Sequence, residues 1–277
     1  MTPAEYCQEK AAQSGSSFYY SFLFLPKPRR EAITALYAFC REVDDIADEC
    51  ADASIARTKL EWWRVELANT FAGRPSHPVS HALLPAIRNY DLALEQFEEI
   101  IEGMEMDLQY VRYADFKALQ LYCYRVASVV GQLAATIFGY SDRKTLKYAH
   151  DLGMAFQLTN IIRDVGEDAR RNRIYLPQDE LAQFGVTEDD LLQGRESAGF
   201  HALMAHQVTR ARAFYQQALQ ALPQPDRKSQ RPGLVMAAIY QKLLNEIERD
   251  DFRVLHQRIT LTPLRKLWIA WRTWVFS

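Results

Sequence analysis

The sequence predicts an all-α fold built as a single domain, and three observations support this. Apolar residues recur at intervals of three and four along the chain, which is the helical period. No stretch alternates apolar and polar residues long enough for a β-strand, and no internal repeat is present. The polar stretch Gln224–Gln230 suits an interhelical loop rather than a domain linker. We therefore expect residues 1–277 to form one helical domain.

The expected helices are separated by glycine, proline or polar residues, which interrupt the helical period. In the first half of the chain they cover residues 3–13, 28–48 and 55–71, with two more between 77 and 106 that meet near Tyr90 and Asp91. In the second half they cover residues 115–138, 142–166, 200–221 and 233–251. Residues 167–185 are expected to be a loop, and Thr187 with Asp190 resembles a capping box.

Composition argues against several classes of protein. The formal net charge is −2, so nothing indicates a nucleic-acid partner. The 4 cysteines form no CxxC pair and no zinc-type spacing with histidine, as expected for free thiols in a reducing cytosol. The N-terminus is polar and lacks a signal-peptide core, and no apolar run approaches the roughly 20 residues that cross a bilayer. A cytoplasmic protein is therefore expected.

A first acidic helix face lies in the segment 37–48. Spacings of three and four place Tyr37, Arg41, Asp44 and Asp48 on one side of the helix. A solvated acidic face would explain this pattern, but the flanking apolar residues indicate a mostly buried helix. Buried carboxylates need a counter-charge, which a hard cation can supply.

A second acidic face follows in the segment 157–168. Asn160, Asp164 and Asp168 stand at i, i+4 and i+8, and Gln157 lies on the same side. Oxygen ligands without histidine or cysteine favour Mg²⁺ over zinc or copper. If the two faces oppose each other, their carboxylates can hold several Mg²⁺ ions, which in turn prefer phosphate ligands. The two faces together predict a site for a diphosphate.

Basic and hydroxyl groups that could complete an anion site lie near both acidic faces. Arg41 and Arg163 are within one helical turn of the carboxylates, and Arg171, Arg173 and Tyr175 follow in the expected loop. The fork of a guanidinium matches phosphate oxygens. A simple salt bridge is the alternative role, above all for Arg171.

An apolar helix face supplies candidate walls for a cavity. Tyr122, Val126, Val130 and Leu133 recur at helical spacing, with the small residues Ala127 and Gly131 among them. Ordinary core packing is one interpretation. The other is that the small residues leave room for a long apolar chain between helices. The residues Phe18, Phe22 and Phe24 are candidates for the same wall.

These segments resemble the squalene/phytoene synthase family. Residues 41–48 match its Arg-x-x-Asp-x-x-x-Asp pattern, residues 160–168 match its second aspartate-rich motif, and residues 173–177 continue the match. Similar stretches at 14–26, 122–131, 238–240 and 243–244 extend the resemblance over nearly the whole chain. Within the family, residues 14–26 and 56–64 are most similar to the bacterial presqualene diphosphate synthases of hopanoid pathways.

The resemblance implies a helical prenyl synthase bundle of the isoprenoid synthase type, with a central cavity and named site residues. Implied Mg²⁺ ligands are Asp44, Asp48, Asn160, Asp164 and Asp168, with Asp45 as the rival of Asp44. Implied diphosphate contacts are Arg41, Arg163, Arg173, Tyr175 and Tyr240, with Ser16 and Ser17 as further hydroxyl groups. Implied walls of the prenyl channel are Tyr37, Phe18, Tyr122, Val126, Val130, Gly131 and Gln157.

The resemblance also implies an activity. It is the Mg²⁺-dependent, head-to-head condensation of two farnesyl diphosphates to presqualene diphosphate. NADPH is not expected, since no glycine-rich strand–helix turn of the dinucleotide-binding kind is present. The alternatives are a phytoene or dehydrosqualene synthase, a complete NADPH-dependent squalene synthase, a terpene cyclase, and a non-catalytic assembly protein of the same fold.

The C-terminal segment predicts a basic amphipathic helix at about residues 262–275. From residue 253 onward the chain carries Arg253, Arg258, Arg265, Lys266 and Arg272 and no acidic residue. One helix face carries Leu264, Leu267, Trp268, Trp271 and Trp274. Such a helix suits the surface of an anionic membrane, on its cytoplasmic side. Packing of the tryptophans onto the domain is the alternative.

Overall fold

The structure is a computed structural model that describes residues 1–13, 21–50 and 52–276. The candidate residues Ser16, Ser17 and Phe18 lie outside the described residues. No β-strand occurs in the described part of the chain, where Arg112 and Ile174 form an isolated β-bridge. The prediction of an all-α fold is therefore confirmed.

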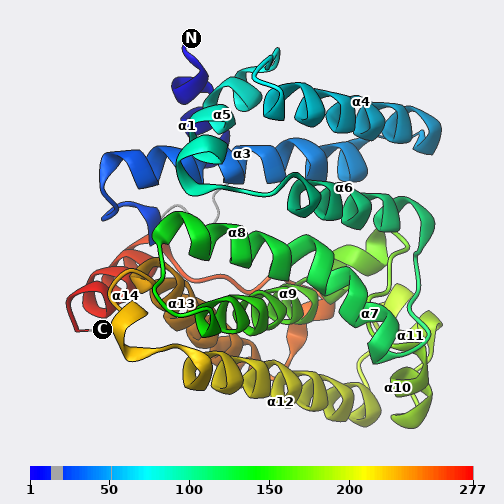
Figure 1. Cartoon of the computed structure of the whole chain (residues 1–277). Helices are drawn as coiled ribbons and strands as arrows, with labels where there is room; N and C mark the ends of the chain where they lie inside the picture. Colours follow the sequence, from blue (N-terminus) through cyan, green and yellow to red (C-terminus); the bar gives the residue numbers. More distant parts are fainter. Residues whose placement is uncertain (14–20, 51, 277) are drawn as a thin grey trace.

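The helices are arranged in two halves (Figure 1). The first half is built from α1 (Pro3–Gln13), α3 (Lys27–Glu49), α4 (Ala53–Phe71), α5 (Pro78–Tyr90) and α6 (Leu94–Gln109). The second half is built from α7 (Phe116–Cys123), α8 (Val129–Phe138), α9 (Lys144–Arg170), α10 (Gln178–Gln183), α11 (Glu188–Leu192), α12 (Ala198–Ala221), α13 (Arg231–Arg249) and α14 (Pro263–Phe276). Two 3₁₀ turns, Gln224–Asp226 and Arg253–Leu255, flank α13.

Each half has its own hydrophobic core. One cluster joins α1 and α3–α6, and α8 contributes Leu133, Ile137 and Phe138 to it. The other cluster joins α7, α9, α12 and α13. Apolar side chains leave water by burying a helix face against a neighbouring helix, which is the main favourable term in folding. The two cores place α3 and α9 on opposite sides of the space between the halves.

Two parts of the helix prediction were wrong. The expected loop 167–185 contains helix: α9 continues to Arg170, and α10 forms at Gln178–Gln183. Pro177 stands just before α10, where its missing N–H removes no helical hydrogen bond. The expected continuous helix 115–138 is interrupted by a π-helical turn, Tyr124–Ser128. The hydroxyl of Ser128 in this turn donates to the carbonyl of His150 on α9 at 2.9 Å.

The stretch Phe116–Phe138 is the one described segment long and apolar enough to cross a membrane by length and composition, with a mean hydropathy of 1.3. This corrects the expectation that no segment reaches that threshold. In this fold its α8 part packs against α3, α6 and α9. Core helices of soluble proteins pass the same test of length and composition.

Helix α9 is the centre of the second half, because α7, α8, α11, α12 and α13 all contact it. Its close approach to α8 and to the π-helical turn depends on two glycines. A Cβ at Gly131 would lie 2.6 Å from the carbonyl oxygen of Ala149, and one at Gly153 would lie 2.6 Å from that of Ala127. Both distances are shorter than any real Cβ contact. Gly131 therefore permits close helix packing, as the core-packing interpretation expects, and its role in the wall of a substrate channel stays a prediction.

The carboxylate of Asp226 ties the loop after α12 to the start of α9. It accepts hydrogen bonds from the amide and hydroxyl of Ser141, at 2.7 and 2.6 Å, and from the hydroxyl of Thr145 at 2.7 Å. The amide of Asp142 donates to its second oxygen at 3.1 Å. Burial raises the pKa of Asp226, but the hydrogen bonds from Ser141 and Thr145 outweigh burial and lower it to about 2. The ionised form is therefore the one that stabilises the fold.

We predict that Asp226→Asn lowers the free energy of unfolding by about 2–3 kcal/mol at neutral pH, since several donors lose a charged acceptor. The pKa of Asp226 is depressed in the folded state, so its contribution is present above the unfolded value near 4 and is lost as pH falls toward 2. Denaturant titrations at pH 7 and pH 2.5 should thus show that the free energies of unfolding of the parent and the variant differ less at the lower pH. The exposed Asp189→Asn is the control and should change little. A difference that is equal at both pH values would contradict this account.

Candidate active site

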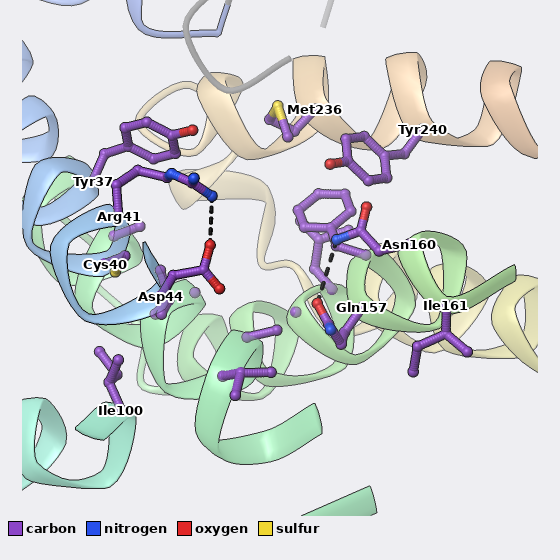
Figure 2. A pocket seen from close by; sticks show the side chains of 18 of the residues that line it. Tyr37, Cys40, Arg41, Asp44, Ile100, Gln157, Asn160, Ile161, Met236 and Tyr240 are labelled. Atoms are coloured by element: carbon purple, nitrogen blue, oxygen red, sulfur yellow. Dashed lines mark hydrogen bonds and ion pairs between the residues drawn. The ribbon is translucent and has the colours of Figure 1, made fainter. Parts of the chain in front are cut away.

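A cavity of about 570 Å³ lies between the two halves of the fold. The predicted ligands, diphosphate contacts and channel walls in the described part of the chain all line it, on α3, α7, the π-helical turn, α8, α9, α13 and the segment before α10. These residues are Tyr37, Arg41, Asp44, Asp48, Tyr122, Val126, Val130, Gly131, Gln157, Asn160, Arg163, Asp164, Asp168, Arg173, Tyr175 and Tyr240. Two further candidates for the apolar wall were wrong, because Leu133 packs in the core of the first half and Phe24 packs against Trp274. Figure 2 shows the α3 side chains facing those of α9 across the space, with Tyr240 of α13 beside them.

The end of α3 supplies the first acidic wall. Arg41 forms ion pairs with both Asp44 and Asp45. Asp45 is also paired with Lys10 of α1 at 2.9 Å, and it is not among the residues that line the cavity. Asp44 rather than Asp45 therefore faces the cavity, as its spacing from Arg41 predicts.

The second acidic wall is the C-terminal half of α9. The side chain of Arg163 is paired with Asp164 at 2.7 Å. The side-chain amide of Asn160 donates to the side-chain oxygen of Gln157 at 3.3 Å. The side-chain oxygen of Asn160 is buried and has no hydrogen-bond partner among the described residues. A buried acceptor without a donor is unfavourable unless a ligand or water satisfies it.

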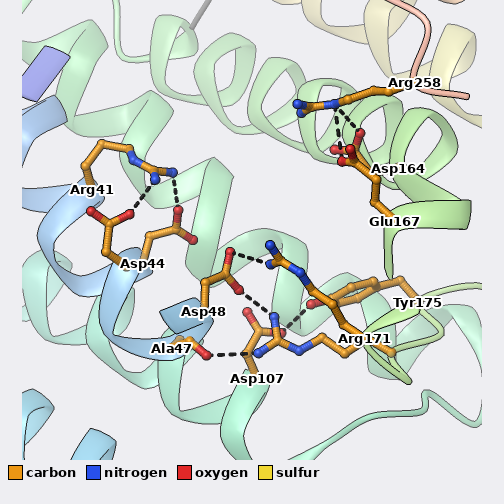
Figure 3. Close-up of polar contacts among 12 residues, drawn as sticks. Arg41, Asp44, Ala47, Asp48, Asp107, Asp164, Glu167, Arg171, Tyr175 and Arg258 are labelled. Atoms are coloured by element: carbon orange, nitrogen blue, oxygen red, sulfur yellow. Dashed lines mark hydrogen bonds and ion pairs between the residues drawn. The ribbon is translucent and has the colours of Figure 1, made fainter. Parts of the chain in front are cut away.

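Arginines from distant parts of the chain pair with the acidic walls (Figure 3). Arg173 binds Asp48 at 2.6 Å and the carbonyl of Ala47 at 2.9 Å, which ties the segment before α10 to the end of α3. Arg171 also pairs with Asp48, at 3.2 Å. The salt bridge considered for Arg171 is thus present, and its side chain lines the cavity as well.

Two of the carboxylates, those of Asp44 and Asp168, have a raised pKa in this site. Burial raises the pKa of Asp44 to about 7, although Arg41 opposes the shift. Burial, with the nearby charges of Asp164 and Asp107, raises the pKa of Asp168 to about 8. Like charges in a buried site disfavour ionisation until a cation balances them. The neighbouring arginines only partly balance these carboxylates.

The donor set of the two walls fits a hard divalent cation such as Mg²⁺. It consists of carboxylate and amide oxygens, and one of these, on Asn160, is buried without a partner. Among the described residues no three His, Cys, Asp or Glu side chains form a group that could hold a metal ion. The carboxylates instead point at arginines: Asp44 at Arg41, and Asp48 at Arg173.

Asp107 on α6 is a buried carboxylate in the cavity wall that the sequence interpretation missed. It accepts hydrogen bonds from the hydroxyls of Tyr122 at 2.9 Å and Tyr175 at 2.7 Å, whose rings stack at 5.2 Å. Burial raises its pKa to about 6, while these two tyrosines oppose the shift. A signal was available, because Asp107 continues the apolar face of Ile100 and Met104 at helical spacing.

Arg258 and Lys266 also line the cavity and were not assigned to it from the sequence. Arg258 pairs with Asp164 at 3.0 Å and with Glu167 at 3.4 Å. Burial and the positive charges of Arg163 and Arg258 lower the pKa of Lys266. The sequence does show their basic character, but their position depends on how the segment after α13 packs back across the cavity.

The wall of the cavity away from the carboxylates is largely apolar. It includes Tyr148 of α9 together with Ile33, Leu36, Phe138 and Leu152. Tyr148 precedes Asp164 by 16 residues, so the two lie about 24 Å apart along the helix axis. The hydroxyl of Tyr148 is buried and has no partner among the described residues. The cavity is thus long, charged at one end and apolar at the other.

A single helical domain with two facing acidic helices and a long apolar recess has the architecture of the isoprenoid synthases. A crystal structure of a dehydrosqualene synthase with ligand has a TM-score of 0.87 and 27% identity, over 99% of this chain and 96% of its own. The squalene synthase HpnC from Alicyclobacillus acidocaldarius has a TM-score of 0.81 and 30% identity, over 90% of this chain and 94% of its own.

The family model of squalene/phytoene synthase matches residues 11–265. Phytoene synthase from Arthrospira platensis is 37% identical over 95% of this chain and 89% of its own length. The chloroplastic phytoene synthase of an Oncidium hybrid cultivar is 37% identical over 94% of this chain, which spans 65% of that protein. The chain therefore belongs to the squalene/phytoene synthase family, whose members are prenyltransferase-type enzymes of isoprenoid biosynthesis.

Two of the tyrosines that line the cavity, Tyr122 and Tyr148, provide a matched test of its hydrogen bonds. Tyr148→Phe should leave the free energy of unfolding unchanged or raise it by up to about 1 kcal/mol, since it removes an unpartnered buried hydroxyl. Tyr122→Phe should lower it by about 1–3 kcal/mol, because Asp107 loses a donor. Denaturant unfolding of the two variants under identical conditions measures the difference. Equal losses would show that the Tyr148 hydroxyl has a partner in solution.

Proposed function

We propose that this protein condenses two farnesyl diphosphates head to head to presqualene diphosphate, with release of one diphosphate and one proton. The observation that carries the proposal is the arrangement of α3 and α9, whose acidic walls face each other at one end of a cavity that is apolar at the other. A diphosphate suits the charged end, and a prenyl chain suits the apolar end.

The charged end offers ligands for both metal and diphosphate. Asp44, Asp48, Asn160, Asp164 and Asp168 would hold Mg²⁺, which supplies positive charge against the charge that develops on a departing diphosphate. The guanidinium groups that now pair with carboxylates can exchange these partners for phosphate oxygens, which match their fork geometry. These groups belong to Arg41, Arg163, Arg173 and Arg258.

The apolar part of the cavity suits the carbon chemistry. When the bond between C1 and oxygen of the donor breaks, an allylic cation forms and must be kept from water. Val126, Val130 and the other apolar side chains of the wall supply a surface without nucleophiles. The double bond of the second molecule then attacks the cation, and loss of a proton closes the cyclopropane ring.

The phenol groups beside Asp107 suit a cationic intermediate. Because Tyr122 and Tyr175 both donate their hydroxyl protons to Asp107, each phenol oxygen can act only as an acceptor toward a group in the cavity. Electron-rich oxygens and aromatic faces favour a cation in a dry site. The proton that is lost leaves to the released diphosphate or to a tyrosine near it.

A second candidate is phytoene formation from two geranylgeranyl diphosphates. It is supported by the relatives at 37% identity, which are phytoene synthases. In that reaction the analogous cyclopropyl diphosphate ionises again and loses a proton, so the first half of the chemistry is shared. The presqualene assignment rests on the resemblance of residues 14–26 and 56–64, and on the likeness to squalene synthase HpnC.

We expect Asp48→Ala and Asp164→Ala each to lower turnover by about a hundredfold or more, because each removes a carboxylate from the proposed cation site. Both carboxylates are in polar surroundings, so the free energy of unfolding should fall by no more than about 1 kcal/mol. Diphosphate release from farnesyl diphosphate at limiting Mg²⁺ measures the effect. Asp45→Ala is the matched control, because Asp45 shares Arg41 with Asp44 but does not line the cavity. Near-normal activity of either cavity variant would contradict the assignment of that helix.

Incubation with farnesyl diphosphate and Mg²⁺ should accumulate presqualene diphosphate, and adding NADPH should change nothing. The measurement is product analysis by mass spectrometry, repeated with geranylgeranyl diphosphate as the only substrate. A conjugated triene from geranylgeranyl diphosphate would establish phytoene synthesis instead. Conversion to squalene with NADPH would extend the reaction beyond the proposed step. Cyclic products made from a single prenyl chain would indicate a terpene cyclase. Absence of diphosphate release would indicate a non-catalytic protein.

A further inference from the structure

Helix α14 has one face on the domain and another that is exposed. It packs against α13, and Ala270 is fully buried in that contact. The opposite side carries an exposed stripe at helical spacing, which we call the outer stripe. It consists of Leu264, Leu267, Trp268, Trp271 and Val275, with exposed fractions of 80%, 42%, 59%, 45% and 49%. Figure 1 shows α14 at the periphery of the molecule beside α13.

The C-terminal tryptophans divide between the domain and the exposed face of α14. Trp274 packs against the domain, where its ring lies 5.3 Å from that of Phe24 and 5.8 Å from the guanidinium of Arg231. Trp268 and Trp271 stack on each other at 5.1 Å and face outward. A contiguous apolar stripe on a protein surface marks a contact with another apolar surface.

The charged residues around the outer stripe indicate what kind of apolar surface the stripe contacts. Residues 253–276 contain no acidic side chain, and Arg272 is exposed beside the stripe. Phe24, which contacts Trp274, is followed at the start of α3 by the exposed Arg30 and by Lys27, which pairs with Glu31 at 3.8 Å. A stripe of leucine and tryptophan bordered by basic groups is complementary to an anionic lipid surface. Two copies packed through this face would bring like charges together.

The same segment also forms part of the cavity wall. Lys266 on α14, with Arg258 and Thr260 before it, lines the cavity, while the outer stripe points away from the domain. A surface that holds α14 therefore lies next to one side of the cavity. A lipidic substrate or product would have a short path between that surface and the cavity.

We infer that α14 is an interfacial helix that seats the protein on an anionic bilayer through the outer stripe, without crossing it. The inference rests on the surface of α14 alone and goes beyond the proposed function. Tryptophan is favoured at the interface between lipid and water, because its ring is apolar and its N–H can be satisfied there. Basic groups near the surface add attraction that falls as salt rises.

The test uses the full chain and vesicles of phosphatidylcholine with or without phosphatidylglycerol. We expect co-sedimentation with the anionic vesicles at low salt, weaker binding at high salt, and a blue shift of tryptophan emission. The double variant Trp268→Ser/Trp271→Ser should weaken binding at least about tenfold, since two aromatic side chains no longer enter the interface. Arg272→Glu should weaken it several-fold through charge alone.

The matched control is Trp62→Ser, which removes a tryptophan of similar exposure, 46%, from α4 on the other half of the fold. It should bind vesicles like the parent. The double variant should also keep its turnover of detergent-dispersed substrate, so failure of the vesicle test is distinguishable from failure of the proposed function. Absence of binding at low salt, or equal binding by the double variant, would overturn the inference. So would a dimer in solution that the double variant dissociates, since a second copy would then cover the stripe.

Discussion

The cavity depends on the balance between its half-buried carboxylates and the arginines that meet them. The acidic walls of α3 and α9 face each other across one space, where the arginines offset the repulsion between like charges. The arginines that compensate them come from separate parts of the chain: Arg41 from α3, Arg173 from the segment before α10, and Arg258 from the segment after α13. The ion pairs that neutralise the site thus also join segments distant in sequence. Any diphosphate that binds must replace part of this network, so its affinity is a difference between two sets of charge-assisted hydrogen bonds.

The acidic walls could be predicted from the sequence because the helical period determines which residues share a face. Asp44 with Asp48, and Asn160 with Asp164, follow from spacing alone once their segments are helical. The opposition of the two walls was a hypothesis, since it depends on how α3 and α9 pack. Asp107 was missed because a single carboxylate in an apolar helix face forms no motif, and its role becomes visible only through Tyr122 and Tyr175.

Other features were wrong or missed for different physical reasons. The π-helical turn at Tyr124–Ser128 follows no local pattern that the helical period reveals, and it lies against α9 and α6. Pro177 falls within the expected loop 167–185, although proline is equally suited to the start of a helix, which is its place before α10. Arg258 and Lys266 were interpreted only as surface charge, because nothing local indicates that their segment returns to the cavity. The exposure of α14 likewise had to be taken from the structure, where the buried Ala270 distinguishes its two faces.

The close contacts of α9 with α8 at Gly131, and with the π-helical turn at Gly153, make the two sides of the cavity mechanically unequal. At these two points backbone meets backbone, so no change of rotamer can adjust the spacing of the helices there. On the side of α3 and α13 the wall is made of side chains such as Leu36 and Met236, which can be exchanged without moving a helix. One wall is therefore stiff and the other compliant. Evolutionary change in the length of chain that the cavity accepts should accumulate on the compliant wall, and the stiff one should be left almost untouched.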